Sequence, residues 1–300
     1  LVAHKKSGHK KGLSKIMIAA HMDEIGLIVK NIEKDGKVKI AAVGGIDSII
    51  LLNEKVTIKT RKKDVRGIIT TDDISSSIFS KDRPLLPEMY IDSGLTKQDV
   101  EKSGVHIGSF ISFSPNTEIL GNEKLICGKA LDDRIGCYIL IEVIKKLKRT
   151  MNELFFVFTV QEEVGLYGAK TSSYTIDPDW AIAVDVTDCN DRLPNASKEL
   201  GGGPTLTIKD EEMISNPSID DKIIEIAKKK KIPIQPDVSD AGTTDAIKIA
   251  ISKGGVPSAV LGVAVRNLHS TTGLANLEDI DKAIILLTEL LKNPPHISAQ

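Results

Sequence analysis

The sequence has few of the features that mark disulfide-rich, zinc-ribbon and membrane proteins. Only three of its 300 residues are cysteines. Cys127, Cys137 and Cys189 are widely spaced and form no CxxC pair, which argues against a disulfide framework and against a zinc ribbon. No apolar run approaches the ~20 residues that a membrane-spanning helix needs. We therefore expect a protein that does not cross a membrane, and a reducing cytoplasm fits its cysteines best.

The composition also disfavours nucleic-acid binding. The 40 Lys and Arg residues are balanced by 41 Asp and Glu residues, and aromatic residues make up 4% of the chain. The chain thus offers neither a basic field for phosphates nor many rings that could stack on bases. One basic stretch, HKKSGHKKGLSK at residues 4–15, has the Lys, Gly and Ser content of a solvated turn, and we interpret it as a surface loop.

The pattern of apolar residues predicts two domains, the larger of them of the α/β class. From about residue 120, continuous apolar runs alternate with segments of helical period, which is typical of a sheet flanked by helices on both faces. The runs are LFFVFTV (154–160), WAIAVDV (180–186) and VPSAVLGV (256–263). Helices are predicted over residues 134–148, over SIDDKIIEIAKKKK with Ser218 as its N-cap, and from Leu277 onward.

Residues 24–117 follow a different pattern. Short strands such as IGLIVKNI, KVKIAAVG, EKVTIKT and VRGIIT are separated by Asp/Gly and Lys/Asp turns, which predicts a small, barrel-like β domain. The segment before it, KIMIAAHMD, has the character of a buried strand. The simplest layout therefore inserts the β domain (24–117) into an α/β domain formed by residues 1–23 and 118–300.

Two of the six histidines occur in suggestive surroundings. His21 ends the run KIMIAA, and Asp23 follows two residues later on the same side of an extended chain. A metal-bound imidazole usually donates its other ring N–H to a carboxylate or carbonyl, although a histidine that binds no metal is an equally good interpretation of this motif alone. His269, in VRNLHSTTG, precedes a turn at the end of an apolar run. The remaining histidines are interpreted as surface residues: His4, His9, His106 and His296.

Three acidic segments end or follow predicted strands. Asp132 and Asp133 lie between a strand and a helix in CGKALDDRIGC, Asp185 lies near the end of WAIAVDV, and Glu162 and Glu163 end FVFTVQEE. A buried ionised carboxylate is costly unless a cation or a hydrogen-bond donor meets it. The alternative for either aspartate of the pair is a helix N-cap, and for the two glutamates it is a loop that begins early.

The shared position of these residues favours a metal centre. Each lies at the carboxyl end of a predicted strand, where α/β sheets place their ligands. Neighbouring residues of an extended chain point to opposite sides, so one of the two adjacent glutamates can bind metal while the other faces water. Three carboxylates and two neutral histidines nearly balance the charge of two divalent cations. Mixed imidazole and carboxylate ligands suit zinc, cobalt or manganese, which activate water and polarise a carbonyl group.

These segments together resemble a known family, the cytoplasmic dinuclear metallo-aminopeptidases. This family includes glutamyl and deblocking aminopeptidases and the tetrahedral (TET) particles, and some members are labelled endoglucanases. The similar segments, in the family's order, are KIMIAAHMDEIGL, ALDDRIG, VQEEVGLYGAK, AVDVTD, KELGGGP, GTTDA and LHS. The resemblance implies a zinc-peptidase-like α/β domain and an enzyme that hydrolyses N-terminal residues from short peptides.

The resemblance also implies a ligand set for two divalent ions, of which zinc or cobalt is expected. Asp132 would bridge the two ions. His21 and Asp185 would complete the site of one ion, and Glu163 and His269 the site of the other.

The roles of two further residues follow from the same resemblance. Glu162 would be the general base, which takes a proton from the attacking water and delivers it to the leaving amine. Asp23 would orient His21. The family suggests that SDAGTTDA borders the substrate pocket, whereas the local pattern predicts a helix start capped by Thr243 or Thr244.

The family implies self-association as well. Its β domain serves dimerisation, and the dimers commonly form a hollow dodecamer that admits peptides and unfolded chains. The family also has a further N-terminal helix and strand, and the present sequence begins at Leu1 without a methionine, so we expect the natural start to lie upstream. That difference bears on stability and assembly but removes no predicted ligand.

Other functions remain open at this point. A deacylase or dipeptidase would use the same dinuclear scaffold and differ in whether it requires a free α-amino group. A glycosidase would use paired carboxylates but would leave His21 and His269 without a role. A particle without catalytic activity, whose metals only stabilise the fold, is the alternative outside the hydrolases.

Overall fold

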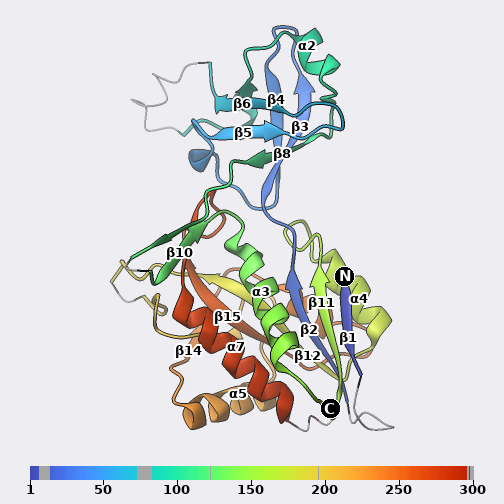
Figure 1. Ribbon diagram of the computed structural model, residues 1–300, viewed down its shortest axis with the longest axis vertical. Coiled ribbons are helices and arrows are strands. Elements are labelled where there is room, and N and C mark those ends of the chain that lie inside the picture. Colours follow the sequence, from blue (N-terminus) through green and yellow to red (C-terminus); the bar gives the residue numbers. More distant parts are fainter. Residues whose placement is uncertain (7–13, 73–82, 122, 195, 296, 298–300) are drawn as a thin grey trace. The chain divides into compact units, whose positions relative to one another are not determined.

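A computed structural model describes residues 1–6, 14–72, 83–121, 123–194, 196–295 and 297. The chain divides into two compact units (Figure 1). The sheet unit consists of Leu1–Asp23, Glu118–Leu268 and Gly273–Gln300. The barrel unit consists of Glu24–Thr117 and His269–Thr272.

The sheet unit is built on one mixed sheet, to which the described residues contribute ten strands. The strand order is β1-β11-β2-β12-β15-β16-β10-β9, and β13 and β14 join it through β15. The strands are β1 (Val2–Lys5), β2 (Lys15–His21), β9 (Glu118–Leu120), β10 (Leu125–Gly128), β11 (Glu153–Thr159), β12 (Trp180–Asp188), β13 (Thr205–Lys209), β14 (Gln235–Val238), β15 (Ser258–Arg266) and β16 (Gly273–Asn276). The predicted α/β fold with a mixed sheet is confirmed.

The directions of the strands decide where the site lies. β2 pairs in parallel with β11 and β12, and β12 pairs in parallel with β15. β16 is antiparallel to both β15 and β10, so β10 runs in the same direction as β15. The carboxyl ends of β2, β10, β11 and β12 therefore lie along the same edge of the sheet, where such sheets place their ligands.

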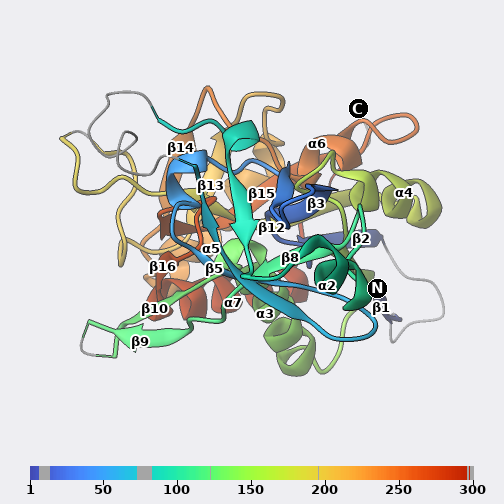
Figure 2. The same ribbon diagram turned by 90° about the horizontal axis from the view of Figure 1, so that it is seen from above.

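Helices cover both faces of this sheet, which explains why its strands are continuous apolar runs. Figure 2 shows α3 (Leu131–Lys146) and α7 (Leu277–Lys292) on one side and α4 (Tyr167–Ile176) and α6 (Asp245–Ala250) on the other. In β2, Ile16 and Ile18 pack in the same cluster as residues of α3, α7 and α5 (Pro217–Lys230). Met17 and Ala19 point the other way and pack with residues of α4 and α6. Each strand thus buries side chains on two faces.

The beginning of the chain differs from the prediction. His4 and Lys5 are not in a loop but in β1, which pairs antiparallel with β11. The imidazole of His4 stacks on the ring of Phe155 at 4.3 Å between centroids, so a flanking aromatic ring supports this short strand. A strand therefore precedes KIMIAA. The rest of the predicted loop at 7–13, and with it His9, lies outside the described residues, as does His296.

The first residue of a helix is set by the residue that caps it. Asn216, rather than Ser218, caps α5: its side chain accepts a hydrogen bond from the Ser218 N–H at 3.1 Å. Pro217 occupies the first helical position, where a missing N–H costs nothing. Thr244 caps α6, as one of the two predicted threonines, and α7 begins at Leu277 as predicted.

The buried carboxyl of Asp220 on α5 should make stability depend on pH. Asp220 is 5% exposed, and burial raises its pKa to about 6, although the Ser215 hydroxyl donates to it. A raised pKa in the folded state stabilises the fold below the unfolded pKa, and this contribution is lost as pH rises through about 6. Asp220→Asn should therefore gain about 2 kcal/mol in unfolding free energy relative to the parent between pH 4.5 and 7, since one pKa unit equals about 1.4 kcal/mol.

Urea unfolding of both proteins in EDTA at the two pH values measures this gain without a contribution from bound metal. The exposed neighbouring Asp221→Asn is the matched control and should change little. If the unfolding free energy of Asp220→Asn differed from that of the parent by the same amount at both pH values, the raised pKa assigned to Asp220 would be contradicted.

The barrel unit contains a closed antiparallel barrel in the order β3-β4-β7-β6-β5-β8. Its strands are β3 (Gly26–Ile32), β4 (Val38–Val43), β5 (Lys55–Ile58), β6 (Val65–Thr70), β7 (Tyr90–Asp92) and β8 (Phe110–Phe113), accompanied by the short helices η1 (Ser48–Ile50), η2 (Leu86–Glu88) and α2 (Lys97–Lys102). Leu27, Ile58, Ile69 and Ile91 lie in its core. The expected barrel-like fold is confirmed. No described helix of either unit is long and apolar enough to cross a bilayer.

Candidate metal centre

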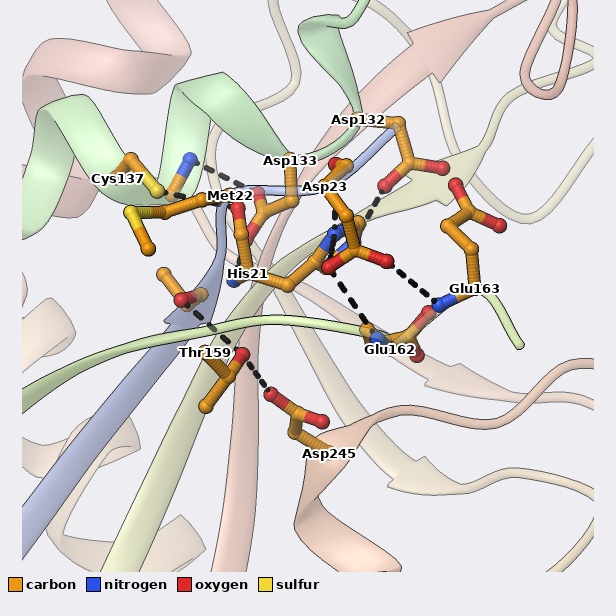
Figure 3. A network of polar contacts seen from close by, with 12 residues as sticks. His21, Met22, Asp23, Asp132, Asp133, Cys137, Thr159, Glu162, Glu163 and Asp245 are labelled. Carbon is orange, nitrogen blue, oxygen red and sulfur yellow. Dashed lines mark hydrogen bonds and ion pairs between the residues drawn. The ribbon is translucent and has the colours of Figure 1, made fainter. Parts of the chain in front are cut away.

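The carboxyl edge of the sheet unit carries several of the predicted residues, and Figure 3 labels His21, Asp23, Asp132, Glu162 and Glu163 among them. His21 is the last residue of β2 and is 2% exposed. Asp185 lies in β12, and Glu162 and Glu163 follow the end of β11 by three and four residues. Asp132 is the second residue of α3, which begins shortly after the end of β10.

The two ring nitrogens of His21 have different partners. Nδ1 lies 3.1 Å from the backbone carbonyl oxygen of Asp23. Nε2 faces carboxylates, at 2.9 Å from Asp132 Oδ1 and 3.8 Å from Asp185 Oδ1. A carbonyl can only accept a hydrogen bond, so this geometry assigns the proton to Nδ1 in the neutral imidazole. Nε2 then has its lone pair directed at the carboxylates, as a metal ligand requires.

Asp23 supports the site in a way that the sequence did not suggest. Its carbonyl, not its carboxylate, is the nearer partner of His21, because the distance from Nδ1 to the carboxylate is 3.7 Å. The carboxylate instead accepts hydrogen bonds from the backbone N–H groups of Glu162 at 3.2 Å and Glu163 at 3.3 Å. Asp23 thus connects the histidine to the segment that carries both glutamates.

The neighbours Asp132 and Asp133 have different contacts. Asp133 is fully buried and accepts hydrogen bonds from the N–H groups of Gly136 at 2.9 Å and His21 at 3.2 Å. A bond to the N–H three residues ahead is the pattern of an N-cap, so the capping interpretation holds for Asp133. Asp132 faces His21 instead. Both have φ/ψ values outside the helical region, and the peptide bond between them is cis.

Several carboxyl groups lie close together in this buried site, and their pKa values are raised. Burial, together with neighbouring acidic groups, raises the pKa of Glu162 to about 8 and raises the pKa of Asp133 and Asp185 well above the ordinary value. Burial favours neutral His21, but the bond to Asp132 and the charges of Asp185 and Asp133 outweigh it and raise its pKa to about 12. The cluster therefore favours positive charge, and a divalent cation that displaces the His21 proton would supply it.

Two sets of donor atoms are close enough to hold a metal ion. The first set is His21, Glu162 and Asp185, and the second is His21, Asp132 and Glu163. Within each set the donor atoms lie within 4.8 Å of one another. A mixture of imidazole nitrogen and carboxylate oxygen suits zinc, cobalt or manganese, so the residues present fit such an ion.

His269, the other predicted ligand, belongs to the barrel unit. Its φ of 54° lies in the left-handed region, and its ring packs so near Gly45 that a Cβ added there would lie 3.0 Å from Nδ1. Ligation by His269 stays a prediction.

Two residues of the site were missed by the analysis of the sequence. Thr159 ends β11, and its hydroxyl oxygen lies 2.5 Å from Oδ2 of Asp245, the first residue of α6. Burial raises the pKa of Asp245 to about 6. The motif GTTDA contains Asp245, but its local pattern indicates only a helix cap at Thr243 or Thr244, and nothing in the sequence pairs Asp245 with a residue 86 positions earlier.

The motif KELGGGP is held by side chains from distant segments. Buried Asp279, on α7, accepts hydrogen bonds from the N–H groups of Gly201 at 2.7 Å and Gly203 at 2.8 Å. Gln235 binds both the N–H and the carbonyl of Glu199. A Cβ at Gly203 would lie 2.1 Å from the carbonyl oxygen of Pro233. The glycines thus allow a close backbone approach, which gives this motif a structural reason.

Known proteins share both sequence and fold with this chain. The profile of the M42 glutamyl aminopeptidase family matches residues 1–286. The lysyl aminopeptidase of Pyrococcus furiosus is 35% identical over 95% of this chain and 83% of its own length. The glutamyl aminopeptidase of Lactococcus lactis is 30% identical over 95% of this chain and 82% of its own length.

Two solved structures share this architecture. The TET aminopeptidase of a marine-sediment thaumarchaeote has a TM-score of 0.92 at 34% identity and covers 98% of this chain and 84% of its own. The TET1 peptidase of Pyrococcus horikoshii, which can assemble into a tetrahedron or a large octahedral shell, has a TM-score of 0.86 at 32% identity, with 97% and 86% covered.

Proposed function

Because this chain belongs to the M42 glutamyl aminopeptidase family, we propose that it is a metal-dependent aminopeptidase with two divalent ions and Glu162 as general base. Asp132 would bridge the ions, His21 and Asp185 would bind one of them, and Glu163 and His269 the other. Zinc or cobalt is the expected metal. When bound, such ions make water more acidic and polarise the scissile carbonyl.

The residues of the chain then have the following tasks. Glu162 accepts the proton of the attacking water and delivers it to the amine of the leaving peptide. Asp23 keeps this glutamate in place through the backbone N–H. Buried Asp133 holds the start of α3, next to Asp132, against the backbone of His21.

The observation that carries the proposal is the arrangement around His21. One buried imidazole donates through Nδ1 to a carbonyl and directs Nε2 at two carboxylates from different elements. A glycosidase needs only two carboxyl groups, and this arrangement would add nothing to its chemistry. A deacylase or dipeptidase on the same scaffold remains the alternative, because its site would contain the same donors.

Matched peptides with free and acetylated N-termini test the proposal. The metal-loaded protein should release residues one at a time from the free N-terminus only, and EDTA should abolish this release. Mass spectrometry of the products with time measures both effects. Cleavage of the acetylated peptide would support a deacylase, and a metal-loaded protein that cuts neither peptide would refute catalysis.

We also infer self-association through the barrel unit. The TET1 peptidase of Pyrococcus horikoshii assembles into shells, and this chain shares its fold. Large apolar side chains are exposed on the barrel unit, among them Phe110 at 62% and Ile107 at 68%. Such side chains favour burial between subunits, as dimerisation would provide. Light scattering should give the mass of a dimer or a dodecamer, and a monomer at micromolar concentration would refute the inference.

A further inference from the structure

Asp245 is a buried carboxylate that the proposed ligand set does not use. It begins α6, is 2% exposed, and lies near Glu162 and Thr159 in Figure 3. Its Oδ2 is hydrogen-bonded to Thr159 Oγ1 at 2.5 Å. Its other oxygen has no hydrogen-bond partner among the described residues. A buried carboxylate with one bond is costly, so its presence calls for an explanation.

Thr159 connects Asp245 to the metal centre. It is the register partner of His21 in the parallel pair β11·β2, so both side chains emerge on the same face of the sheet. Its carbonyl accepts a hydrogen bond from the Met22 N–H at 3.0 Å, and its hydroxyl lies 3.3 Å from the carbonyl of Ala20. The hydroxyl has one proton: it donates either to ionised Asp245 or to Ala20 while protonated Asp245 donates to it. The bond between Thr159 and Asp245 persists in either case.

The chain turns sharply between Thr159 and the glutamates. Gln161 has a φ of 60°, a left-handed conformation that costs a non-glycine residue about 1 kcal/mol. The turn packs closely against the start of α4, since the Gly168 N–H donates to the Val160 carbonyl at 3.0 Å. A Cβ at Gly168 would lie 2.5 Å from that oxygen. A strained turn keeps its shape only when its surroundings hold it.

Hydrogen bonds hold this turn on both sides. On the far side, the Asp23 carboxylate binds the N–H groups of Glu162 and Glu163. On the near side, the Thr159 side chain is held by Asp245. Backbone bonds hold the segment as well, because the N–H groups of Gly165 and Leu166 donate to the Glu162 carbonyl at 3.0 Å, so the two side-chain anchors bear on its position rather than on its existence.

We propose that Asp245 is a positioning residue that, through the Thr159 hydroxyl, fixes the strand end from which Glu162 is presented. The inference rests on the proposed role of Glu162 as general base. Asp245 need not touch substrate or metal. Its effect requires the hydrogen bond, not the charge, because an amide at position 245 could donate to the same hydroxyl.

The experiment compares four single substitutions and one double. Thr159→Val keeps the shape and removes the hydroxyl, and Asp245→Ala removes its partner. Each should lower kcat about 10- to 100-fold, as small displacements of catalytic groups do, with KM within twofold and metal content unchanged. The double variant should be no slower than the slower of these two single variants, because both single substitutions remove the same hydrogen bond. Thr159→Ser and Asp245→Asn, which restore the bond, should recover kcat to within about threefold.

Hydrogen–deuterium exchange of the metal-free protein supplies a readout without activity. Peptides that cover residues 160–166 should exchange about tenfold faster in Thr159→Val than in the parent, and at the parental rate in Thr159→Ser. Unchanged exchange in Thr159→Val would overturn the inference even if kcat fell. An Asp245→Asn variant as slow as Asp245→Ala would also overturn it, because charge would then be what matters. A parent without aminopeptidase activity would refute the proposed function but would leave the exchange result to decide this inference.

Discussion

Glu162→Gln should retain the full metal content of the parent and lose turnover by about 10²- to 10⁴-fold, the usual contribution of a general base. Glutamine has nearly the same shape and can keep the backbone hydrogen bond to Asp23, but it cannot accept a proton. Mass spectrometry of the digested protein after dialysis measures the metal content. The kcat for a short peptide measures the loss of turnover.

The matched control is Glu163→Gln at the adjacent position. It should lose metal, because Glu163 is the proposed ligand, and its activity should recover in part when metal is added in excess. The test is needed because both glutamates lie in donor sets within reach of an ion. If Glu162→Gln lost metal and Glu163→Gln retained it, the two roles would have to be exchanged.

Asp132→Asn and Asp133→Ala should fail in different ways although the two residues are adjacent. Asp132→Asn should weaken metal affinity by more than the roughly 10- to 100-fold typical of changes around the ligands, because it removes a ligand itself. Its metal-free fold should be about as stable as that of the parent, because the loss of the bond to His21 is opposed by relief of the repulsion between Asp132 and the buried carboxyl groups of Asp133 and Asp185. Asp133→Ala should destabilise the fold by about 3 kcal/mol, because it leaves the N–H groups of His21 and Gly136 without their acceptor.

Thermal unfolding in EDTA and in added zinc separates these two effects. The parent should gain in Tm when zinc is added, because a ligand that binds only the folded state stabilises it. Asp132→Asn should start from the parental Tm in EDTA and gain little. Asp133→Ala should start lower and still gain. A zinc response in Asp132→Asn equal to that of the parent would remove Asp132 from the ligand set.

The sequence was most informative where periodicity and strand ends coincide. The run that ends at His21 and the run that ends before Glu162 are buried strands because their apolar residues alternate between two helix layers. Their parallel pairing then places their polar ends at one edge. The α/β sheet and the carboxyl-edge position of the site could therefore be predicted from local pattern alone.

What could not be predicted depends on contacts between distant residues. The bond between Thr159 and Asp245 joins residues 86 positions apart, and neither residue alone differs from an ordinary strand or helix-start residue. The preference of His21 for the carbonyl of Asp23 over its carboxylate depends on where the chain turns after β2. The N-cap of α5 was placed two residues late because Asn216 and Pro217 precede the first apolar position of the helical pattern.

The order of the sheet strands along the chain has a consequence for biosynthesis. β2 ends at His21, whereas its neighbours in the sheet, β11 and β12, begin only at Glu153 and Trp180. At roughly 5–20 residues per second, β2 waits on the order of ten seconds without its partners. All six strands of the barrel are complete by Phe113, so the barrel can fold during this interval. The candidate site is thus brought together only after β12, which contains Asp185, has been made, and any metal that this edge binds could enter only from that point.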